Sequence, residues 1–271
     1  MTTPANLLSS QRRQLILDTI RSSGAARVTD LAGRLEVSDM TIRRDLEALD
    51  RAGAVRRVHG GAVAVDGPSL GATREDIEPG FDAKTALAHT EKVHIARSAA
   101  RMVRPGTTIA LSAGTTTYAL AAELAGLEHL TVVTNSTDAA DLLYESLPAS
   151  SQVILTGGVR TRSHALVGPI AMAAMKTLRV DVVFHGFHGM DEQWGFTCPN
   201  LSEVATAQVM IHAGSRLVAL VDHSKWGVVA LTSVAELSCA DVLITDSGIS
   251  ADALRALRRH IGEVVVATGS S

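Results

Sequence analysis

The first 65 residues carry apolar side chains at the three- to four-residue spacing of amphipathic helices. This spacing predicts three helices, over residues 11–22, 29–35 and 39–51. In the first of them, the side expected to face the core holds Leu15, Ile16, Thr19 and Ile20. Ser38 stands just before the third helix, where its hydroxyl can accept a hydrogen bond from a free backbone N–H of the first turn.

The third predicted helix has an apolar side and a basic side. Its core-facing residues are Ile42, Leu46 and Leu49. With these residues inside, the helix should direct four side chains partly or wholly outward, those of Thr41, Arg43, Arg44 and Asp45. Residues 55–63 then alternate like a β-hairpin with a glycine turn and basic outward positions, which is the form of a wing. A helix with paired arginines near its start can place its N-terminal half in the major groove of DNA.

An ordinary three-helix core with a charged surface would show the same helical pattern, and the basic hairpin favours DNA binding over it. The residues expected to contact DNA are Ser38, Met40, Thr41, Arg43, Arg44, Arg56, Arg57 and His59.

From residue 81 onward, short apolar runs alternate with helical stretches. The runs that predict strands are Thr108 to Leu111, Thr131 to Thr134, Val153 to Leu155, Val180 to Phe184, Leu217 to Val221, Val242 to Ile244 and Val264 to Val266. Helices are expected from about Thr90 to Val103 and from Tyr118 to Leu124. Strands separated by helices imply parallel βαβ units. We therefore expect an α/β domain, doubly wound and mostly parallel, with helices on both faces of its sheet.

Glycine and small polar residues follow several of these strands, and parallel sheets bind ligands at the carboxyl ends of their strands. Residues 112–117 (SAGTTT) lead into a helix, so that backbone N–H groups and hydroxyls there form a candidate anion cradle. A capping turn without a ligand is the alternative. The residues expected at a small-molecule effector are Gly114, Thr115, Thr116, Thr117, Asn135, Ser136, Gly158, Gly186, His188, Asp222 and Lys225.

Charge is distributed unevenly along the chain, whose formal net charge is −3. Residues 1–65 hold 10 arginines and 7 acidic residues, a net of +3, and the rest holds 15 basic and 21 acidic residues, a net of −6. A basic head on an acidic body indicates an anionic partner near the N-terminus.

The length of 271 residues and the composition predict two domains of unequal size. Residues 66–80 mix glycine, proline and acids without an apolar period, which is typical of a linker. We expect a DNA-binding domain over residues 1–65, a linker over 66–80, and an effector-sensing and oligomerisation domain over 81–271.

The two cysteines, Cys198 and Cys239, form no CxxC motif and suit a reducing compartment. No signal-peptide pattern and no apolar stretch of roughly 18 residues is visible. We therefore expect a cytoplasmic protein without membrane contact and without a cofactor. His185 and His188 are three residues apart with no ligand at a standard metal spacing, which favours a sugar contact or a plain structural role over a metal site.

Two long segments resemble one known family. The segment VTDLAGRLEVSDMTIRRDLEALDRAGAVRRVHGGAV resembles the DNA-binding head of the DeoR family of bacterial regulators. The body is similar to that family through EKVHIA at 91–96, GTTT at 114–117, VVTNS at 132–136, LTGG at 155–158, VGP at 167–169 and DHSKWG at 222–227. The sensor domain of this family is similar in fold to ribose-5-phosphate isomerase and the coenzyme A transferases.

The resemblance implies a repressor of a carbohydrate catabolic operon. It would bind an inverted or direct repeat in operator DNA as a homodimer or homotetramer. Its affinity for the operator would fall when a phosphorylated sugar binds. It further implies that residues 115–117 hold the phosphate, that Asn135, Gly158 and Gly186 line the sugar, and that Lys225 lies near the anionic group. Asp39 and Met40 stand where such sequences vary, so they are expected to influence operator preference.

The chain departs from the family pattern at several positions. Ser112 replaces a more usual aspartate, and His185 and His188 replace small or apolar residues, which suggests an unusual ligand. Glu203 lacks the lysine that isomerases place beside it. There are two alternatives. One is an isomerase-like enzyme that carries a DNA-binding head. The other is a DNA-binding protein whose larger domain serves only for oligomerisation. The missing lysine argues against the enzyme, so we expect no catalytic residue in this chain. The polar residues at the strand ends argue against a domain that only oligomerises.

Overall fold

The computed structural model describes residues 12–13, 15–17, 19–20, 25–35, 37–51, 55–58, 61–64 and 88–269. The chain divides into two compact units, Met1–Pro79 and Gly80–Ser271. The expected linker at 66–80 lies outside the described residues. Within the described part of the chain, no helix is both long enough and apolar enough to cross a membrane.

The smaller unit combines helices with a small antiparallel sheet. Its helical segments include residues 12–13, 15–17 and 19–20, followed by α2 (Val28–Leu35) and α3 (Asp39–Arg51). Strands β2 (Val55–Val58) and β3 (Gly61–Ala64) form the expected hairpin, and β1 (Ala25–Arg27) adds a third strand in the order β1-β3-β2. The core is built from apolar residues of all these elements, including Ile16, Ile20, Leu31, Ile42, Leu46 and Val55.

Two expectations for this unit are wrong. Leu15, predicted to face the core, is exposed, and Leu17 is buried in its place. Asp45, predicted to face outward, is only 3% exposed because arginines of the first helix approach its carboxylate. The apolar period alone did not reveal this ion pair, since it joins residues more than 30 positions apart.

The larger unit is built on one parallel sheet of seven strands, in the order β15-β14-β12-β9-β4-β5-β6. The strands are β4 (Thr108–Leu111), β5 (Thr131–Thr134), β6 (Gln152–Leu155), β9 (Val182–Gly186), β12 (Leu217–Leu220), β14 (Val242–Asp246) and β15 (Glu263–Ala267). All six neighbouring pairs are parallel. The predicted fold class is confirmed, and each predicted apolar run overlaps one of these strands, although the run predicted from Val180 begins two residues before β9.

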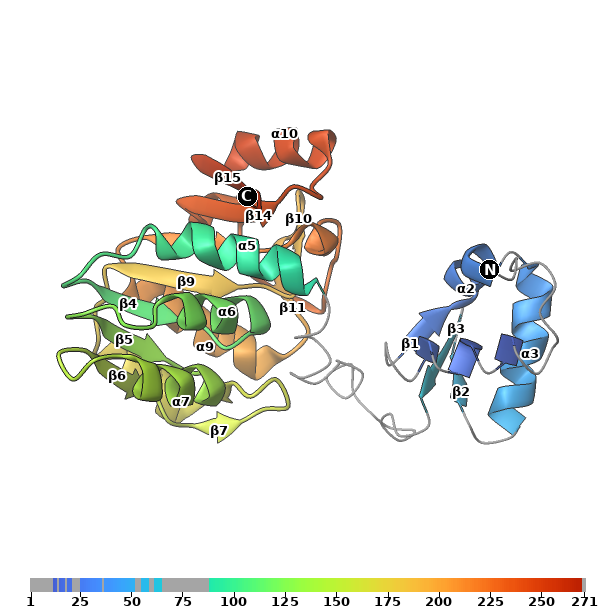
Figure 1. Cartoon of the computed structure of the whole chain (residues 1–271), viewed down its shortest axis with the longest axis horizontal. Helices are drawn as coiled ribbons and strands as arrows, with labels where there is room; N and C mark the ends of the chain where they lie inside the picture. Colours follow the sequence, from blue (N-terminus) through green and yellow to red (C-terminus); the bar gives the residue numbers. More distant parts are fainter. Residues whose placement is uncertain are drawn as a thin grey trace. The chain divides into compact units, whose positions relative to one another are not determined.

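Helices cover both faces of this sheet (Figure 1). One face carries α5 (His89–Ala100), α6 (Thr115–Glu123) and α7 (Thr137–Ser146). The other carries α8 (Pro169–Lys176), α9 (Leu201–Ala213) and α10 (Ala251–His260).

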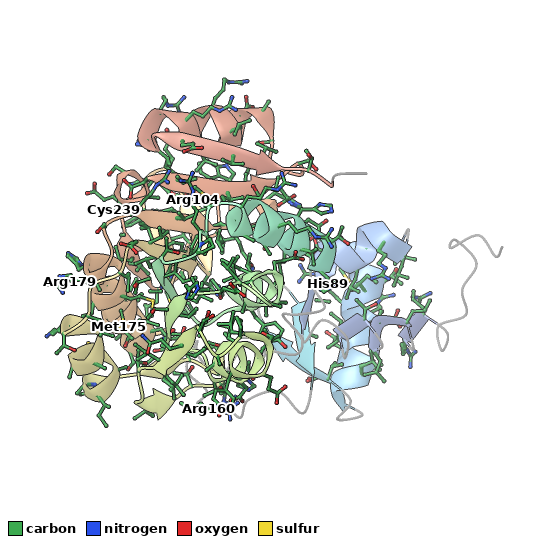
Figure 2. The ribbon with its side chains drawn as sticks, turned by 60° about the vertical axis from the view of Figure 1, so that its left-hand side comes forward. His89, Arg104, Arg160, Met175, Arg179 and Cys239 are labelled. Atoms are coloured by element: carbon green, nitrogen blue, oxygen red, sulfur yellow. The ribbon has the colours of Figure 1, made fainter. Side chains whose placement is uncertain are left out.

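Alternate strand residues belong to the two cores, as the pleat of a strand requires. In β4, Ile109 and Leu111 pack with α5 and α6, while Ala110 packs on the opposite face. Side chains fill the space between the sheet and both helical layers (Figure 2). Met175 of α8 is fully buried there, whereas Arg179 just beyond α8 is exposed at the surface.

Two short antiparallel elements were not predicted. Strands β10 (Gly189–Asp191), β11 (Gly195–Cys198) and β13 (Thr232–Ala235) form a small sheet, and α9 packs against it. Strands β7 (Val159–Arg160) and β8 (Leu166–Val167) form a hairpin between β6 and α8. These strands of two to four residues are too short to show a clear period in the sequence.

Candidate functional site

The start of α3 is held by a side-chain cap. Ser38 Oγ accepts a hydrogen bond from the backbone N–H of Thr41 at 3.2 Å, and the two hydroxyls lie 2.9 Å apart. The expected N-cap is therefore present. These two polar side chains fix the first turn of α3, so they present its exposed residues in a defined orientation.

The outer side of α3 carries an apolar and two basic side chains. Met40 is 59% exposed, and Arg43 and Arg44 are exposed on the side away from the core residues Ile42 and Leu46. Among the residues that the structure describes, neither guanidinium has a hydrogen-bond or ion-pair partner. Two long cations on one exposed helix surface are available to phosphate oxygens or guanine edges.

Asp45 connects α3 to the first helix. Its Oδ2 accepts a hydrogen bond from Arg12 Nε at 2.6 Å, and its Oδ1 accepts one from Arg13 Nε at 3.1 Å. The buried carboxylate thus pairs with two arginines and offsets one of their two positive charges. It also fixes α3 against the first helix, which places Asp45 among the supporting residues of the candidate DNA surface.

The hairpin expected as the wing has regular antiparallel pairing, with Arg56 opposite Val63 and Arg57 opposite Ala62. Both arginines lie on β2, and their side chains are outside the described residues, as is all of His59.

The effector candidates lie at the ends of strands of the parallel sheet or just after them, so they lie along one edge. The chain passes from β4 outward to β5 and β6, and then returns to β9 on the other side of β4. This makes the β4–β9 boundary the switch point of the sheet, where the loops after two neighbouring strands run in opposite directions. Open α/β sheets bind ligands at such a point.

The loop after β4 leads directly into α6. Gly114 precedes the first helical residue, Thr115, and no side chain caps the helix in this fully described stretch. Thr117 is buried, and its hydroxyl donates to the Gly114 carbonyl at 3.0 Å, so that it supports the loop. The uncapped N–H groups at the start of α6 and the half-buried Thr115 remain available to an anion.

The residues after β5 are occupied by structural hydrogen bonds. Asn135 Oδ1 accepts from the Ala113 N–H at 2.8 Å, and Asn135 Nδ2 donates to the Leu166 carbonyl at 3.1 Å. Ser136 caps α7, because its Oγ accepts from the Ala139 N–H at 3.2 Å. Asn135 therefore ties the β4 loop to the β7–β8 hairpin, a role that its position after a strand did not reveal.

The two glycines among the candidates differ in their surroundings. A Cβ at Gly158 would lie 2.6 Å from the Val167 carbonyl oxygen, so a glycine is needed where β8 approaches. At Gly186 a Cβ would have ordinary contacts, and the Gly186 N–H donates to Ser112 Oγ at 3.1 Å. His188, two residues further, is half-buried.

The loop after β12 brings a cation to the same edge. Asp222 is buried and accepts from the Ser224 N–H at 3.0 Å and from the Ser224 hydroxyl, so it caps the short 3₁₀ helix His223–Lys225. Lys225 is half-buried at the end of this turn. Since β12 neighbours β9, Lys225 follows a strand next to the switch point.

A buried aspartate that the sequence did not single out holds the loop after β12 at this edge. Asp246, at the end of β14, accepts from the N–H groups of His223 and Gly248 and from His223 Nδ1 at 2.7–2.9 Å. Burial acts to raise the pKa of Asp246, but these hydrogen bonds outweigh it and lower the pKa below its usual value. The buried carboxylate thereby fixes the loop that carries Lys225.

Comparison with known proteins agrees with both halves of this arrangement. A family model described as the DeoR-like helix-turn-helix domain matches residues 12–67, and one described as the DeoR C terminal sensor domain matches residues 87–247. The chain belongs to the DeoR family of transcriptional regulators.

Relatives match this DeoR-family chain over almost its full length. An uncharacterized HTH-type transcriptional regulator, YgbI of Escherichia coli K12, is 37% identical over 96% of this chain and 99% of its own. A putative aga operon transcriptional repressor of Escherichia coli O157:H7 is 30% identical, covering 95% and 94% of the two chains. The glycerol-3-phosphate regulon repressor of Escherichia coli K12 is 29% identical, covering 93% and 96%.

Among solved structures, ribose 5-phosphate isomerase A from Methanocaldococcus jannaschii covers 51% of this chain and 55% of its own. The sequence identity is 19% and the TM-score 0.38, a similarity too low to carry a functional inference.

In this DeoR-family chain Glu203 supports the β7–β8 hairpin. Its Oε1 accepts hydrogen bonds from the hydroxyls of Thr161 at 3.0 Å and Ser163 at 2.5 Å, and Cys198 Sγ lies 3.7 Å from Oε2. Asn200 caps the first turn of α9 and so positions this carboxylate. Over the described residues, no group of three or more side chains has the arrangement of a metal site.

Proposed function

We propose that this protein represses a carbohydrate catabolic operon, and that a phosphorylated sugar at the carboxyl edge of the large sheet weakens its hold on operator DNA. The observation that carries the proposal is the coexistence of an exposed basic surface on α3 with an uncapped helix N-terminus at the switch point and with Lys225 after the neighbouring strand β12. The regulator names of the relatives support it over an isomerase-like enzyme.

The DNA surface would consist of the start of α3 and the β2–β3 wing. Met40, Arg43 and Arg44 would enter the major groove, with Ser38 and Thr41 at the helix start close to the phosphates. The wing would add Arg56, Arg57 and His59. An arginine that binds guanine in a bidentate manner contributes about 1 to 3 kcal/mol of discrimination, while phosphate contacts act on all sequences alike.

The test is fluorescence anisotropy with a DNA fragment from the region upstream of the gene. The double variant Arg43→Ala, Arg44→Ala is expected to bind at least tenfold more weakly. Arg258→Ala, Arg259→Ala removes an equal charge from the exposed surface of α10 and should bind like wild type. Wild-type affinity in the first variant would contradict the assignment of α3.

The effector would place its phosphate at the start of α6, where uncapped N–H groups and the helix dipole favour an anion. Thr115, Thr116 and Gly114 would surround the phosphate, and Lys225 would add a full positive charge. The sugar would extend toward Gly158, Gly186 and His188. Asn135, Ser136, Thr117 and Asp222 would contribute by holding these loops, since their side chains already have partners.

Isothermal titration calorimetry can test this site with ribose 5-phosphate, fructose 6-phosphate and glycerol 3-phosphate, each beside its unphosphorylated parent. Lys225→Ala should lose about 1.5 to 3 kcal/mol of affinity for the phosphorylated ligand, the contribution of a charge-assisted hydrogen bond. Lys176→Ala, which removes an exposed lysine at the end of α8, is the control. Equal binding of a phosphorylated ligand and its parent would contradict the cradle.

The proposal includes a DNA-binding domain over 1–65, a linker over 66–80 and a sensing and oligomerisation domain over 81–271. A homodimer or homotetramer would bind repeated half-sites whose centres lie about 10 base pairs, or a multiple of this, apart. Footprinting that found a single half-site bound by a monomer would count against it.

A further inference from the structure

Three neighbouring strands of the large sheet end in a row of buried polar residues, Asn135, Ser112 and His185. Leu111 of β4 is paired with Thr134 of β5 and with Phe184 of β9, and each member of this polar row follows one of these residues directly. The Ser112 N–H continues the ladder by donating to the Phe184 carbonyl at 3.1 Å. The three side chains therefore lie beside one another at the switch point.

The polar row faces the side of the sheet covered by α8 and α9. Two positions earlier, the same strands place Val133, Ala110 and Val183 in the core beneath these helices. The row thus replaces an apolar layer by polar groups just where the sheet reaches its ligand-binding edge. Its members remain buried, with His185 only 8% exposed.

Two members of the polar row have side-chain hydrogen-bond partners, and the third has one buried ring nitrogen without a partner in the described part of the chain. Asn135 bonds to the backbone of Ala113 and Leu166, and Ser112 Oγ accepts from the Gly186 N–H. His185 Nδ1 is buried and has no hydrogen-bond partner among the described residues. A buried polar atom without a partner costs free energy, and a hydrogen-bonding group of a ligand at this edge of the sheet would recover that cost.

The surroundings of His185 define the partner. Its ring lies 4.5 Å from the ring of Phe187, which stacks on Phe196 at 4.1 Å. Burial lowers the pKa of His185 to about 4, against a weaker opposing effect of a hydrogen bond with Gly186, so the imidazole is neutral at physiological pH. A neutral imidazole lacks the positive charge that would favour a phosphate or carboxylate over other partners, whereas a hydroxyl can donate to Nδ1 in one tautomer and accept from it in the other.

We propose that His185 is a specificity-determining residue, whose Nδ1 hydrogen-bonds a hydroxyl group of the effector. The effector is then a polyhydroxylated molecule, oriented with its anionic group at the start of α6 and one hydroxyl over the polar row. Ser112 connects these two positions, because the loop to α6 begins at this residue. The inference rests on the proposed function only in placing the effector at this edge.

The first experiment needs no ligand and measures the melting temperature of the full-length protein by tryptophan fluorescence. Both tryptophans, Trp194 and Trp226, lie in the larger unit and report its unfolding. His185→Leu removes the unpartnered nitrogen and should raise the melting temperature by about 2 to 4 °C. Ser112→Ala, which leaves the Gly186 N–H without a partner, should lower it. A decrease of several degrees in His185→Leu would overturn the inference, since the imidazole would then be part of the structural framework.

The second experiment measures ligand affinity by calorimetry with ribose 5-phosphate, fructose 6-phosphate and glycerol 3-phosphate. For each ligand that binds wild type, His185→Leu should weaken binding at least tenfold and leave the preference for the phosphorylated over the unphosphorylated form unchanged. His185→Gln, which keeps a donor and an acceptor, should bind better than the leucine variant. Wild-type affinity in His185→Leu, or equal losses in both variants, would overturn the inference.

The two experiments separate this inference from the proposed function. Lys225→Ala tests the anion cradle, because this variant should lose the preference for a phosphorylated ligand over its unphosphorylated parent. If none of the three phosphates binds wild type, the phosphate proposal fails for these ligands, and the melting temperatures of His185→Leu and Ser112→Ala decide the role of His185.

Discussion

Replacing Asp45 by alanine should destabilise the DNA-binding unit far more than replacing an exposed acid of the same helix. The Asp45 carboxylate is 4% exposed and pairs with Arg12, which is 15% exposed, and with Arg13, which is 42% exposed. Removing one partner of a fully buried pair costs about 3 to 5 kcal/mol, because the remaining charge stays buried. Arg13 can turn to water and Arg12 is more enclosed, so we expect a loss of about 2 to 3 kcal/mol.

Urea unfolding of the full-length chain can isolate this effect. Both tryptophans belong to the larger unit, so fluorescence follows that unit alone, whereas circular dichroism follows both units. Unfolding of the smaller unit appears as a transition in circular dichroism that is absent from fluorescence. In Asp45→Ala the midpoint of this transition should fall by about 2 M urea, if the free energy of unfolding decreases by about 1 kcal/mol per M urea. The fluorescence midpoint should not move.

Two variants make this comparison quantitative. Asp45→Asn keeps an acceptor oxygen but no charge and should lie between wild type and Asp45→Ala. Glu47→Ala removes an exposed acid of α3 and should cost less than about 1 kcal/mol. If Asp45→Ala unfolds at the same urea concentration as Glu47→Ala, the argument that the buried carboxylate holds the first helix against α3 is wrong.

Two further predictions concern the larger unit. Asn135→Ala leaves the Ala113 N–H and the Leu166 carbonyl without their side-chain partner and should lower the free energy of unfolding, followed by fluorescence, by about 2 to 4 kcal/mol. Asn135→Asp keeps the acceptor for Ala113 and should lose less. Equal stability of Asn135→Ala and wild type would contradict the role of Asn135 in joining the β4 loop to the β7–β8 hairpin. Because the pKa of His185 is lowered from 6.5 to about 4, the unfolded chain takes up a proton at a higher pH than the folded one, and stability should fall by about 3 kcal/mol between pH 6.5 and 4. His185→Leu should lack this part of the decline, and an identical pH profile in the variant would refute it.

The main architecture could be predicted from the sequence because the strands of a buried parallel sheet are continuous apolar runs. The run at 108–111 and the run at 131–134 coincide with β4 and β5. The helices of the smaller unit likewise follow from their apolar period, and Ser38 from its position before α3. Each of these signals is local, so a single stretch of sequence contains it.

Features that depend on distant contacts could not be predicted in the same way. Asp45 looks like a surface residue until the first helix is placed against α3. Asn135 looks like a ligand residue until the β7–β8 hairpin supplies Leu166 as its partner. The polar row requires the register of three strands, and the sequence indicates only that His185 follows an apolar run.

The measurement that tests the account most directly is the anisotropy titration of an upstream DNA fragment, repeated with each phosphorylated sugar and with its parent. Wild type should bind DNA at least tenfold more weakly with the phosphorylated effector and unchanged with the parent. Lys225→Ala should bind DNA like wild type and no longer respond at the same ligand concentration. A Lys225→Ala protein that releases DNA as readily as wild type, or a parent sugar as effective as its phosphate, would contradict the account.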